Sequence, residues 1–410
     1  MAAIAGTAIL ALVLAAGCGP EADRKQAAAF KAEDVNRQQI EAYNQFAVRM
    51  TKQLLQESGE TNFVISPLSV TLALSLALNG ASGETKQEML RMLNVDRLPM
   101  EAINQGSEVL IDLLEHGDPA VDVKIANALW ARKGTQLLDD YTGRMKQFYE
   151  AEISELDFDR KDAASTINKW VRKQTHNRID SMADPEKLRS NVMVLMNAVY
   201  FNGRWTEPFK VSATRNAPFH LADGTDVTVP LMAQRASLPY KEGEGFKAVR
   251  LPYGSGRWGM IIVLPSEGVS LRDAEAALLA DPAQLWRKDF ESGDTIVELP
   301  RFKLDYKKKV SGILQSLGMK RAFDKQTADF SAMVSGSEGL YISSVTHKAF
   351  IEVDEQGTEA AAATSIEMDG GGEPSAAPFE LRADRPFFFA IEDRTTGALM
   401  FLGSVSNPSS

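Results

Sequence analysis

The chain has 410 residues, of which 44% are hydrophobic and 24% are charged, a composition typical of a folded globular protein. A net charge of −10, without a long run of Lys and Arg, argues against binding to nucleic acid through its phosphates. The single cysteine, Cys18, excludes an intrachain disulfide.

The N-terminal residues have the pattern of an export signal followed by a tether. Residues 4–17 are apolar and end in small residues, a length that suits a signal peptide and is too short for a membrane-spanning helix. Ala-Ala-Gly-Cys resembles a bacterial lipobox, which predicts acylation of Cys18; a plain signal peptide with a fortuitous cysteine is the alternative. We expect a signal peptide at 1–17, a tether at 18–36 and one folded domain at 37–408. The protein is then exported, and either lipid-anchored at the cell envelope or surface, or extracellular.

Helical patterns dominate the first half of the folded part. Apolar residues follow one helical face from Ile40 to Leu54. Ser66 followed by Pro67 is a strong helix-start signal. The segment from there to Leu78 is apolar on nearly all sides, which predicts a buried helix. Further helices are expected at 84–93, 100–114, 163–179, 271–279 and 306–317, the last with Lys307 to Lys309 at a solvated start.

Apolar runs typical of strands are concentrated in the second half. The run 192–201 is apolar at nearly every position, so we expect a strand covered on both faces. Helices followed by strands indicate an α+β fold rather than alternating βαβ units. The expected strands are 62–65, 192–201, 258–264, 295–299, 348–353, 386–392 and 398–405.

The common motifs of enzymes and metal sites are missing from the sequence. It has no His-Glu-x-x-His, Walker A or Gly-x-Ser-x-Gly motif. The four histidines are scattered, without a second ligand at metal-binding spacing. Residues 254–259 match Gly-x-Gly-x-x-Gly, but an apolar strand follows where a nucleotide site needs a helix, so this motif predicts a hairpin turn. We expect no enzyme activity, no cofactor and no metal.

Residues 355–375 have the composition of an exposed loop but the pattern of a strand. Every second residue from Thr358 to Met368 is uncharged, whereas the complementary set contains Glu359, Glu367 and Asp369. A period of two indicates a strand with one buried face. For this segment alone, an Ala-rich helix or linker is the alternative.

The flanks of this segment resemble the serpin family of serine protease inhibitors. Residues 345–361 resemble the family's hinge, and 384–391 and 397–408 resemble its C-terminal strands. Blocks at 62–69, 197–205 and 299–302 match further family segments in the family's order, so the resemblance covers about 37 to 408. It implies the serpin fold, an α+β fold with a five-stranded central sheet, two smaller sheets and about nine helices. The exposed reactive-centre loop would lie at about 355–380.

The resemblance implies an irreversible, suicide-substrate inhibitor of serine-type endopeptidases. The target protease attacks the loop and becomes acylated through its nucleophile. The cleaved loop then inserts into the central sheet, and a dozen inserted residues would carry the protease about 40 Å. A serpin that does not inhibit and a surface-anchored binding lipoprotein are the alternatives. The residues that match the family's hinge are Glu355, Gly357, Thr358, Glu359, Ala360, Ala361, Ala362 and Ala363.

Two polar clusters also follow from the resemblance. Ser66, Ser69, Asn197 and His347 match the shutter, beneath the middle of the central sheet. There, hydrogen-bonded groups can re-pair when the strands part. Without the resemblance, His347 would be a satisfied core histidine. Trp205 and Arg301, together with Glu355, match the breach where the loop first inserts, and we hypothesise an ion pair between Glu355 and Arg301.

The position of the scissile bond stays open within one window. Counting from the hinge places it near Gly371, and counting back from Pro386 places it nearer Ser375. The window is Met368, Asp369, Gly370, Gly371, Gly372, Glu373, Pro374 and Ser375. Because it lacks Lys and Arg, we expect elastase- or subtilisin-like targets rather than trypsin-like ones; a glutamyl-specific protease remains an alternative. The expected partners are this protease and, only through a lipid anchor, a membrane; we expect a monomer that does not bind nucleic acid.

Overall fold

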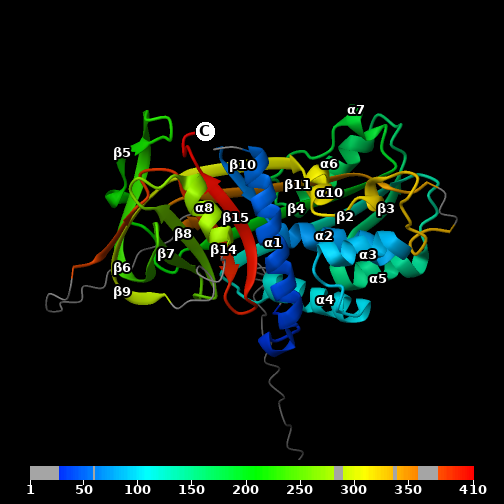
Figure 1. Cartoon of the computed structure of the whole chain (residues 1–410), viewed down its shortest axis with the longest axis horizontal. Helices are drawn as coiled ribbons and strands as arrows, with labels where there is room; N and C mark the ends of the chain where they lie inside the picture. Colours follow the sequence, from blue (N-terminus) through cyan, green and yellow to red (C-terminus); the bar gives the residue numbers. More distant parts are fainter. Residues whose placement is uncertain (1–26, 59–60, 281–289, 336–338, 359–376) are drawn as a thin grey trace, which may run out of the picture.

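The computed structural model describes residues 27–58, 61–280, 290–335, 339–358 and 377–410. This part of the chain is an α+β fold in which helices pack against two β-sheets (Figure 1). Its α-helices, nine in all, are α1 (Arg37–Ser58), α2 (Pro67–Gly80), α3 (Gly83–Met92), α4 (Met100–His116), α5 (Asp139–Tyr149), α6 (Ala163–Gln174), α7 (Pro185–Leu188), α8 (Leu271–Ala280) and α10 (Ser311–Ser316). None of the helices in these ranges is long and apolar enough to cross a membrane.

The strands of the described residues follow the same chain-order labels. They are β1 (Phe63–Ile65), β2 (Val121–Arg132), β3 (Glu152–Leu156), β4 (Met193–Arg204), β5 (Arg215–His220), β6 (Asp226–Gly243), β7 (Phe246–Tyr253), β8 (Trp258–Pro265), β9 (Glu291–Pro300), β10 (Phe302–Lys309), β11 (Ile342–Val353), β12 (Gly357–Thr358), β13 (Phe379–Arg382), β14 (Phe387–Asp393) and β15 (Ala398–Val405).

The central sheet has five long strands in the order β10-β11-β4-β2-β3, and the two-residue β12 lies between β11 and β4 at one end. The pair β11–β4 is parallel and runs from Ile342 opposite Met193 to Ala349 opposite Val199. We call this parallel pairing the seam.

Helices cover both faces of the sheet at the seam. On one face α2 packs against the main core, and all of its residues are buried. On the other face α6 forms a second apolar cluster with β2 and β4, which includes Ile167 from the helix and Met196 from β4. The prediction that the strand at 192–201 is buried on both faces is therefore confirmed. The predicted start of α2 is also confirmed, because Ser66 Oγ accepts a hydrogen bond from Ser69 N.

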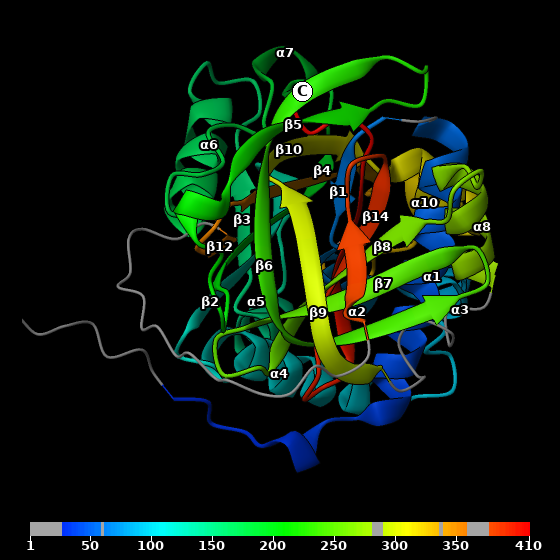
Figure 2. The same cartoon turned by 90° about the vertical axis from the view of Figure 1, so that its left-hand side faces the viewer.

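The second sheet contains both of the smaller sheets that the family resemblance implies, joined by one long strand. Its order is β1-β15-β14-β8-β7-β6-β9-β13, with β5 paired to β6. The 18 residues of β6 pair with β5 and β9 over their first part and with β7 at their end. Figure 2 shows β6 and β9 side by side at this end of the molecule.

Two expected helices differ from the structure. The predicted helix 306–317 is wrong in its first part, because β10 extends to Lys309 and pairs with β11 along its whole length. This pairing buries Phe302 and Leu304, and only Ser311–Ser316 is helical. The helix expected at 163–179 ends at Gln174, because His176 and Asn177 adopt left-handed backbone angles, with φ of 46° and 64°.

Candidate functional site

A buried polar network lies where β11, β4 and β2 run side by side. His347 is directly opposite Asn197, and Asn197 is directly opposite Asn127. Ser66 and Ser69, at the start of α2, lie beneath these three strands. Each of the five residues is at most 1% exposed. The structure thus brings together the four residues assigned to the shutter and adds Asn127.

Asn197 is the centre of this network. Its Oδ1 accepts hydrogen bonds from Ser69 Oγ at 2.5 Å and from His347 Nδ1 at 2.6 Å. Its Nδ2 donates to Ser69 O at 3.0 Å and to Asn127 Oδ1 at 2.7 Å. The side-chain amide is therefore bonded at both ends, to α2 and to both neighbouring strands.

His347 is neutral in this environment. Its Nε2 accepts the backbone N–H of Ser66 at 3.0 Å, so the ring proton lies on Nδ1 and points to Asn197. Burial lowers the pKa of His347 to about 3. The two bonds of this ring connect β11 with β4 and with α2, and the bond to Asn197 links the two strands of the seam at its middle.

Asn127 was missed by the sequence analysis. It lies on β2 in the run Ile125-Ala-Asn-Ala-Leu129, whose residues are all buried. A single amide within an apolar strand needs a buried hydrogen-bond partner, and this rule could have drawn attention to it.

The seam already holds the first residues of the assigned hinge. Thr358 pairs with Val353 of β11 and with Gly203 of β4, and Gly357 pairs with Arg204. Gly357 has a φ of +151°, and a Cβ there would lie 2.1 Å from Gly203 O. Glycine is thus required where the chain turns into the sheet.

The predicted ion pair between Arg301 and Glu355 is present. Nε and Nη2 of Arg301 lie 3.0 and 2.5 Å from Glu355 Oε1, and Glu355 is 4% exposed. Burial alone would raise the pKa of Glu355, but the hydrogen bonds from Arg301 and Thr214 lower it below its ordinary value. Glu355 therefore stays ionised and fixes the chain two residues before β12 begins at Gly357.

Trp205 lies on the other side of the same turn. Its Nε1 donates to Asp354 O at 2.9 Å, and its ring stacks on Tyr253 with centroids 4.2 Å apart. The hydroxyl of Tyr253 is 2.6 Å from Thr358 Oγ1. Burial raises the pKa of Tyr253 well above its ordinary value, so this phenol is neutral and can donate. The sequence analysis assigned Trp205, Arg301 and Glu355 to one cluster. The structure places all three at the turn that precedes β12.

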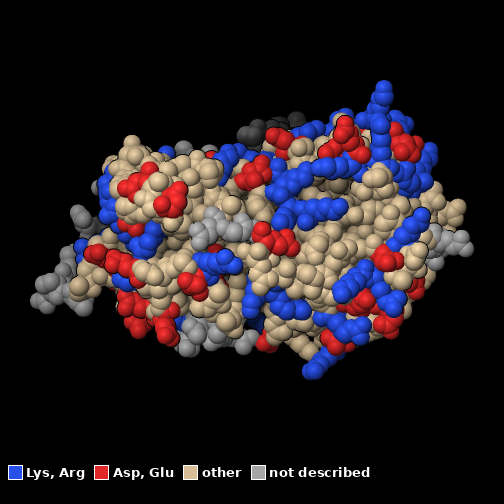
Figure 3. Space-filling model, turned by 45° about the horizontal axis from the view of Figure 1, so that its top comes forward, with Lys and Arg blue, Asp and Glu red and all other residues tan. Residues whose placement is uncertain are grey.

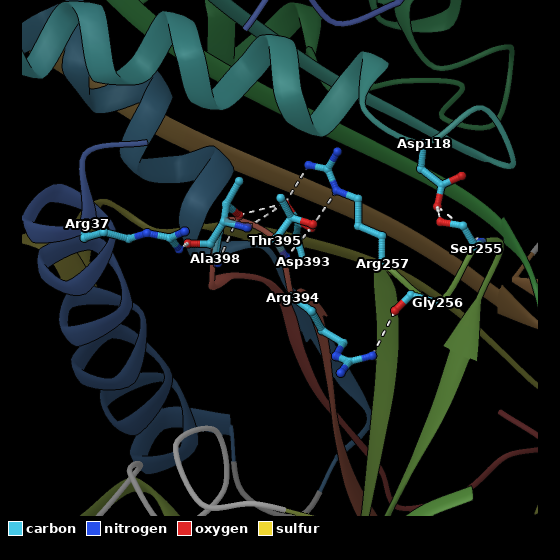
Figure 4. A network of polar contacts seen from close by, with 10 residues as sticks. Arg37, Asp118, Ser255, Gly256, Arg257, Asp393, Arg394, Thr395 and Ala398 are labelled. Carbon is cyan, nitrogen blue, oxygen red and sulfur yellow. Dashed lines mark hydrogen bonds and ion pairs between the residues drawn. The ribbon is translucent and has the colours of Figure 1, made fainter. Parts of the chain in front are cut away.

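A second polar network supports the hairpin that carries Tyr253 (Figure 4). Arg257 donates two hydrogen bonds, each of 2.8 Å, to the buried carboxylate of Asp393. Ser255 Oγ donates to Asp118 at 2.9 Å, and Gly254 N donates to Arg204 O at 2.8 Å. The hairpin turn predicted at 254–259 is confirmed, because β7 and β8 pair on either side of it.

Several assigned residues lie outside the described residues. They are Cys18, the hinge residues Glu359 to Ala363 and the scissile window Met368 to Ser375. Within the described ranges, the structure contains no group of three or more His, Cys, Asp or Glu side chains that could hold a metal ion.

Comparison with known proteins identifies the family. The family model described as Serpin (serine protease inhibitor) matches residues 41–408. An uncharacterized serpin-like protein of Thermococcus kodakarensis is 37% identical over 374 residues, covering 90% of this chain and 85% of that protein. The leukocyte elastase inhibitor of Bos taurus is 35% identical over 390 residues, covering 90% and 100%.

The fold is also similar to that of solved structures. The crystal structure of human thyroxine-binding globulin complexed with thyroxine has a TM-score of 0.81 and 28% identity, and covers 91% of this chain and 98% of that chain. The family match spans nearly the whole described part of the chain and includes both polar clusters. The chain belongs to the serpin family.

Proposed function

We propose that this serpin is an irreversible inhibitor of serine-type endopeptidases that inserts its cleaved loop into the central sheet. The observation that carries the proposal is the position of Gly357 and Thr358 between β11 and β4. The residues that follow Thr358 would extend the new strand along the seam. Cleavage would release the far end of the loop, so that this extension could proceed.

The contacts at the seam suit this reaction. Below β12, β11 and β4 must part from Ala349–Val199 down to Ile342–Met193. At its middle the separation breaks the hydrogen bond from His347 to Asn197, a polar contact that an inserted strand can replace. Interlocked apolar side chains at this point would lose their packing instead. The uncharged alternate residues from Thr358 to Met368 would face the buried side.

Elastase- or subtilisin-like proteases are the proposed targets. The window Met368 to Ser375 contains no Lys or Arg for a trypsin-like enzyme. The similarity to a leukocyte elastase inhibitor supports the same class. The similarity to thyroxine-binding globulin keeps a serpin that binds a ligand without inhibiting as the second candidate.

The test is to mix the full chain with an elastase, a subtilisin, a glutamyl endopeptidase and trypsin. We expect a band at the summed mass that survives heat and detergent, and the mass of the released C-terminal peptide locates the cut bond. Loop insertion should also raise the melting temperature of the cleaved protein. Cleavage within 368–375 without a covalent band and without a gain in melting temperature would contradict the proposal and favour the second candidate.

We also propose that Cys18 is acylated and anchors the exported protein. The support is the lipobox-like sequence at 15–18, and two acyl chains give stable anchoring where one does not. Metabolic labelling with palmitate in a bacterial host should label the wild type and not Cys18→Ser. An unlabelled wild type that is released into the medium would favour the plain signal peptide.

A further inference from the structure

A groove lies beside the point where the chain leaves the reactive loop. Its volume is about 740 Å³, and it lies where the end of β6 and the start of β7 meet the start of β9 and the segment that leads into β13. Tyr240 and Phe379 stack within it with centroids 4.3 Å apart. Lys247 Nζ lies 5.3 Å from the centroid of Phe379 and 3.4 Å from Glu242. These contacts bind Phe379 to the body of the protein.

The lining of the groove carries a small excess of acidic side chains. Glu242, Glu291 and Glu380 line it and are exposed, and Lys241 and Lys247 are the basic residues of its lining. Two more exposed glutamates, Glu244 and Glu267, lie close by, on turns joined by the hydrogen bond from Ser266 N to Gly245 O. Figure 3 shows Asp and Glu side chains gathered at this end of the molecule, over β6 and β9.

The negative charge in the groove affects the pKa of Tyr240. Its hydroxyl donates to Glu291 Oε2 at 3.2 Å. This hydrogen bond first, then partial burial and the charges of Glu291 and Glu242, raise the pKa of Tyr240 above its ordinary value. A cation placed here would be attracted by the carboxylates.

The groove is within reach of a protease bound to the loop. Ser375, at the end of the scissile window, precedes Phe379 by four residues, which span at most about 14 Å. From Met368, at the other end, the span is at most about 40 Å. A protease domain of about 220 residues has a radius of gyration near 17 Å, so its surface beside the catalytic cleft would lie over the groove.

We propose that this groove is a second contact surface for the target protease, and that it selects proteases with Lys or Arg beside the active-site cleft. This inference rests on the proposed inhibitory function. It further predicts that proteases with a basic rim around the active-site cleft are inhibited fastest. Because the glutamates are exposed, they act mainly by steering the encounter of the two proteins. The acyl-enzyme step and loop insertion do not use them.

The test compares association rates for two proteases that both form the covalent complex, one with a basic and one with an acidic cleft rim. In Glu242→Gln/Glu291→Gln/Glu380→Gln, three negative charges are removed while the side chains keep their size. We expect about a tenfold lower rate with the basic-rimmed protease at low salt, and little difference at about 1 M salt, where the charges are screened. The rate with the acidic-rimmed protease should stay the same or rise.

The matched control is Glu84→Gln/Asp139→Asn/Asp140→Asn, on α3 and α5 at the other end of the molecule (Figure 1). It changes the net charge equally and should leave both rates within twofold of the wild type. Equal loss of rate in both variants, or no loss in either, would overturn the proposed contact surface while the covalent complex still forms. Absence of a covalent complex with every protease would instead refute the proposed function, and the contact surface with it.

Discussion

Nδ1 of His347 donates to Oδ1 of Asn197 at 2.6 Å, across the seam where β11 and β4 pair. Nε2 of the same ring accepts from Ser66 N, so no ring nitrogen is left for a second proton. The neutral ring therefore joins the two strands that must part for a loop to insert.

The native state should become less stable as the pH is lowered, because His347 must stay neutral in the folded protein. Its pKa is about 3 when folded and near 6.5 when unfolded, so its contribution is complete above about pH 6.5. The contribution is lost progressively as pH falls from 6.5 toward 3, by about 2 kcal/mol at pH 5. Urea unfolding midpoints at pH 7.5 and pH 5 measure this loss.

His347→Asn should be less stable at neutral pH and should lose less stability between the two pH values. The same pH dependence in His347→Asn and the wild type would show that another group is responsible.

Reversing the charge of Arg301 should make the native state convert faster to latent or polymeric forms. Arg301→Glu would place two carboxylates at the turn that precedes β12, where the buried Glu355 needs a cation. We expect several-fold faster loss of the monomer band on native gels at elevated temperature. The double variant Arg301→Glu/Glu355→Arg should restore most of the lifetime.

Arg235→Glu is the control for this experiment, since it breaks the exposed pair with Asp294 on β6 and β9, away from the seam. If it shortens the lifetime as much as Arg301→Glu, the effect comes from net charge and not from the contact with Glu355.

A side chain at position 357 should expel β12 from the sheet. In Gly357→Ala the new Cβ would meet the carbonyl oxygen of Gly203, in a backbone region that L-residues rarely adopt. We expect hydrogen exchange of the Thr358 amide to become at least tenfold faster, which corresponds to about 1.4 kcal/mol of lost local stability. Gly143→Ala, in α5 with no atom within 4 Å of the added methyl, should leave this exchange unchanged.

Charges on the two faces of the loop segment should have different effects. Ala362 belongs to the uncharged alternate set and Ala361 to the other set. Ala362→Glu should bury a carboxylate on insertion, so that more serpin is cleaved per protease trapped, by several-fold. Ala361→Glu should keep a stoichiometry within about twofold of the wild type, as measured by titration of protease activity. Equal effects of both substitutions would argue against insertion in this register.

Local sequence patterns correctly predicted those helices and strands that are defined by residues adjacent in the chain. Ser66-Pro67 marks the start of α2, and the apolar run 192–201 marks a strand buried on both faces. The run Lys307 to Lys309 was wrongly expected at a helix start. Only the pairing with β11, about 40 residues later, shows that these residues continue a strand.

The sequence by itself determined the family, because contiguous motifs carry the resemblance, and that resemblance in turn suggested the pairing of Arg301 with Glu355, 54 residues apart. The tertiary structure alone brought Asn127 to Asn197, Tyr253 to Thr358 and Tyr240 to Phe379. These partners are 70 to 139 residues apart in the chain. Sheet register and packing, which depend on the whole core at once, decide which distant side chains meet.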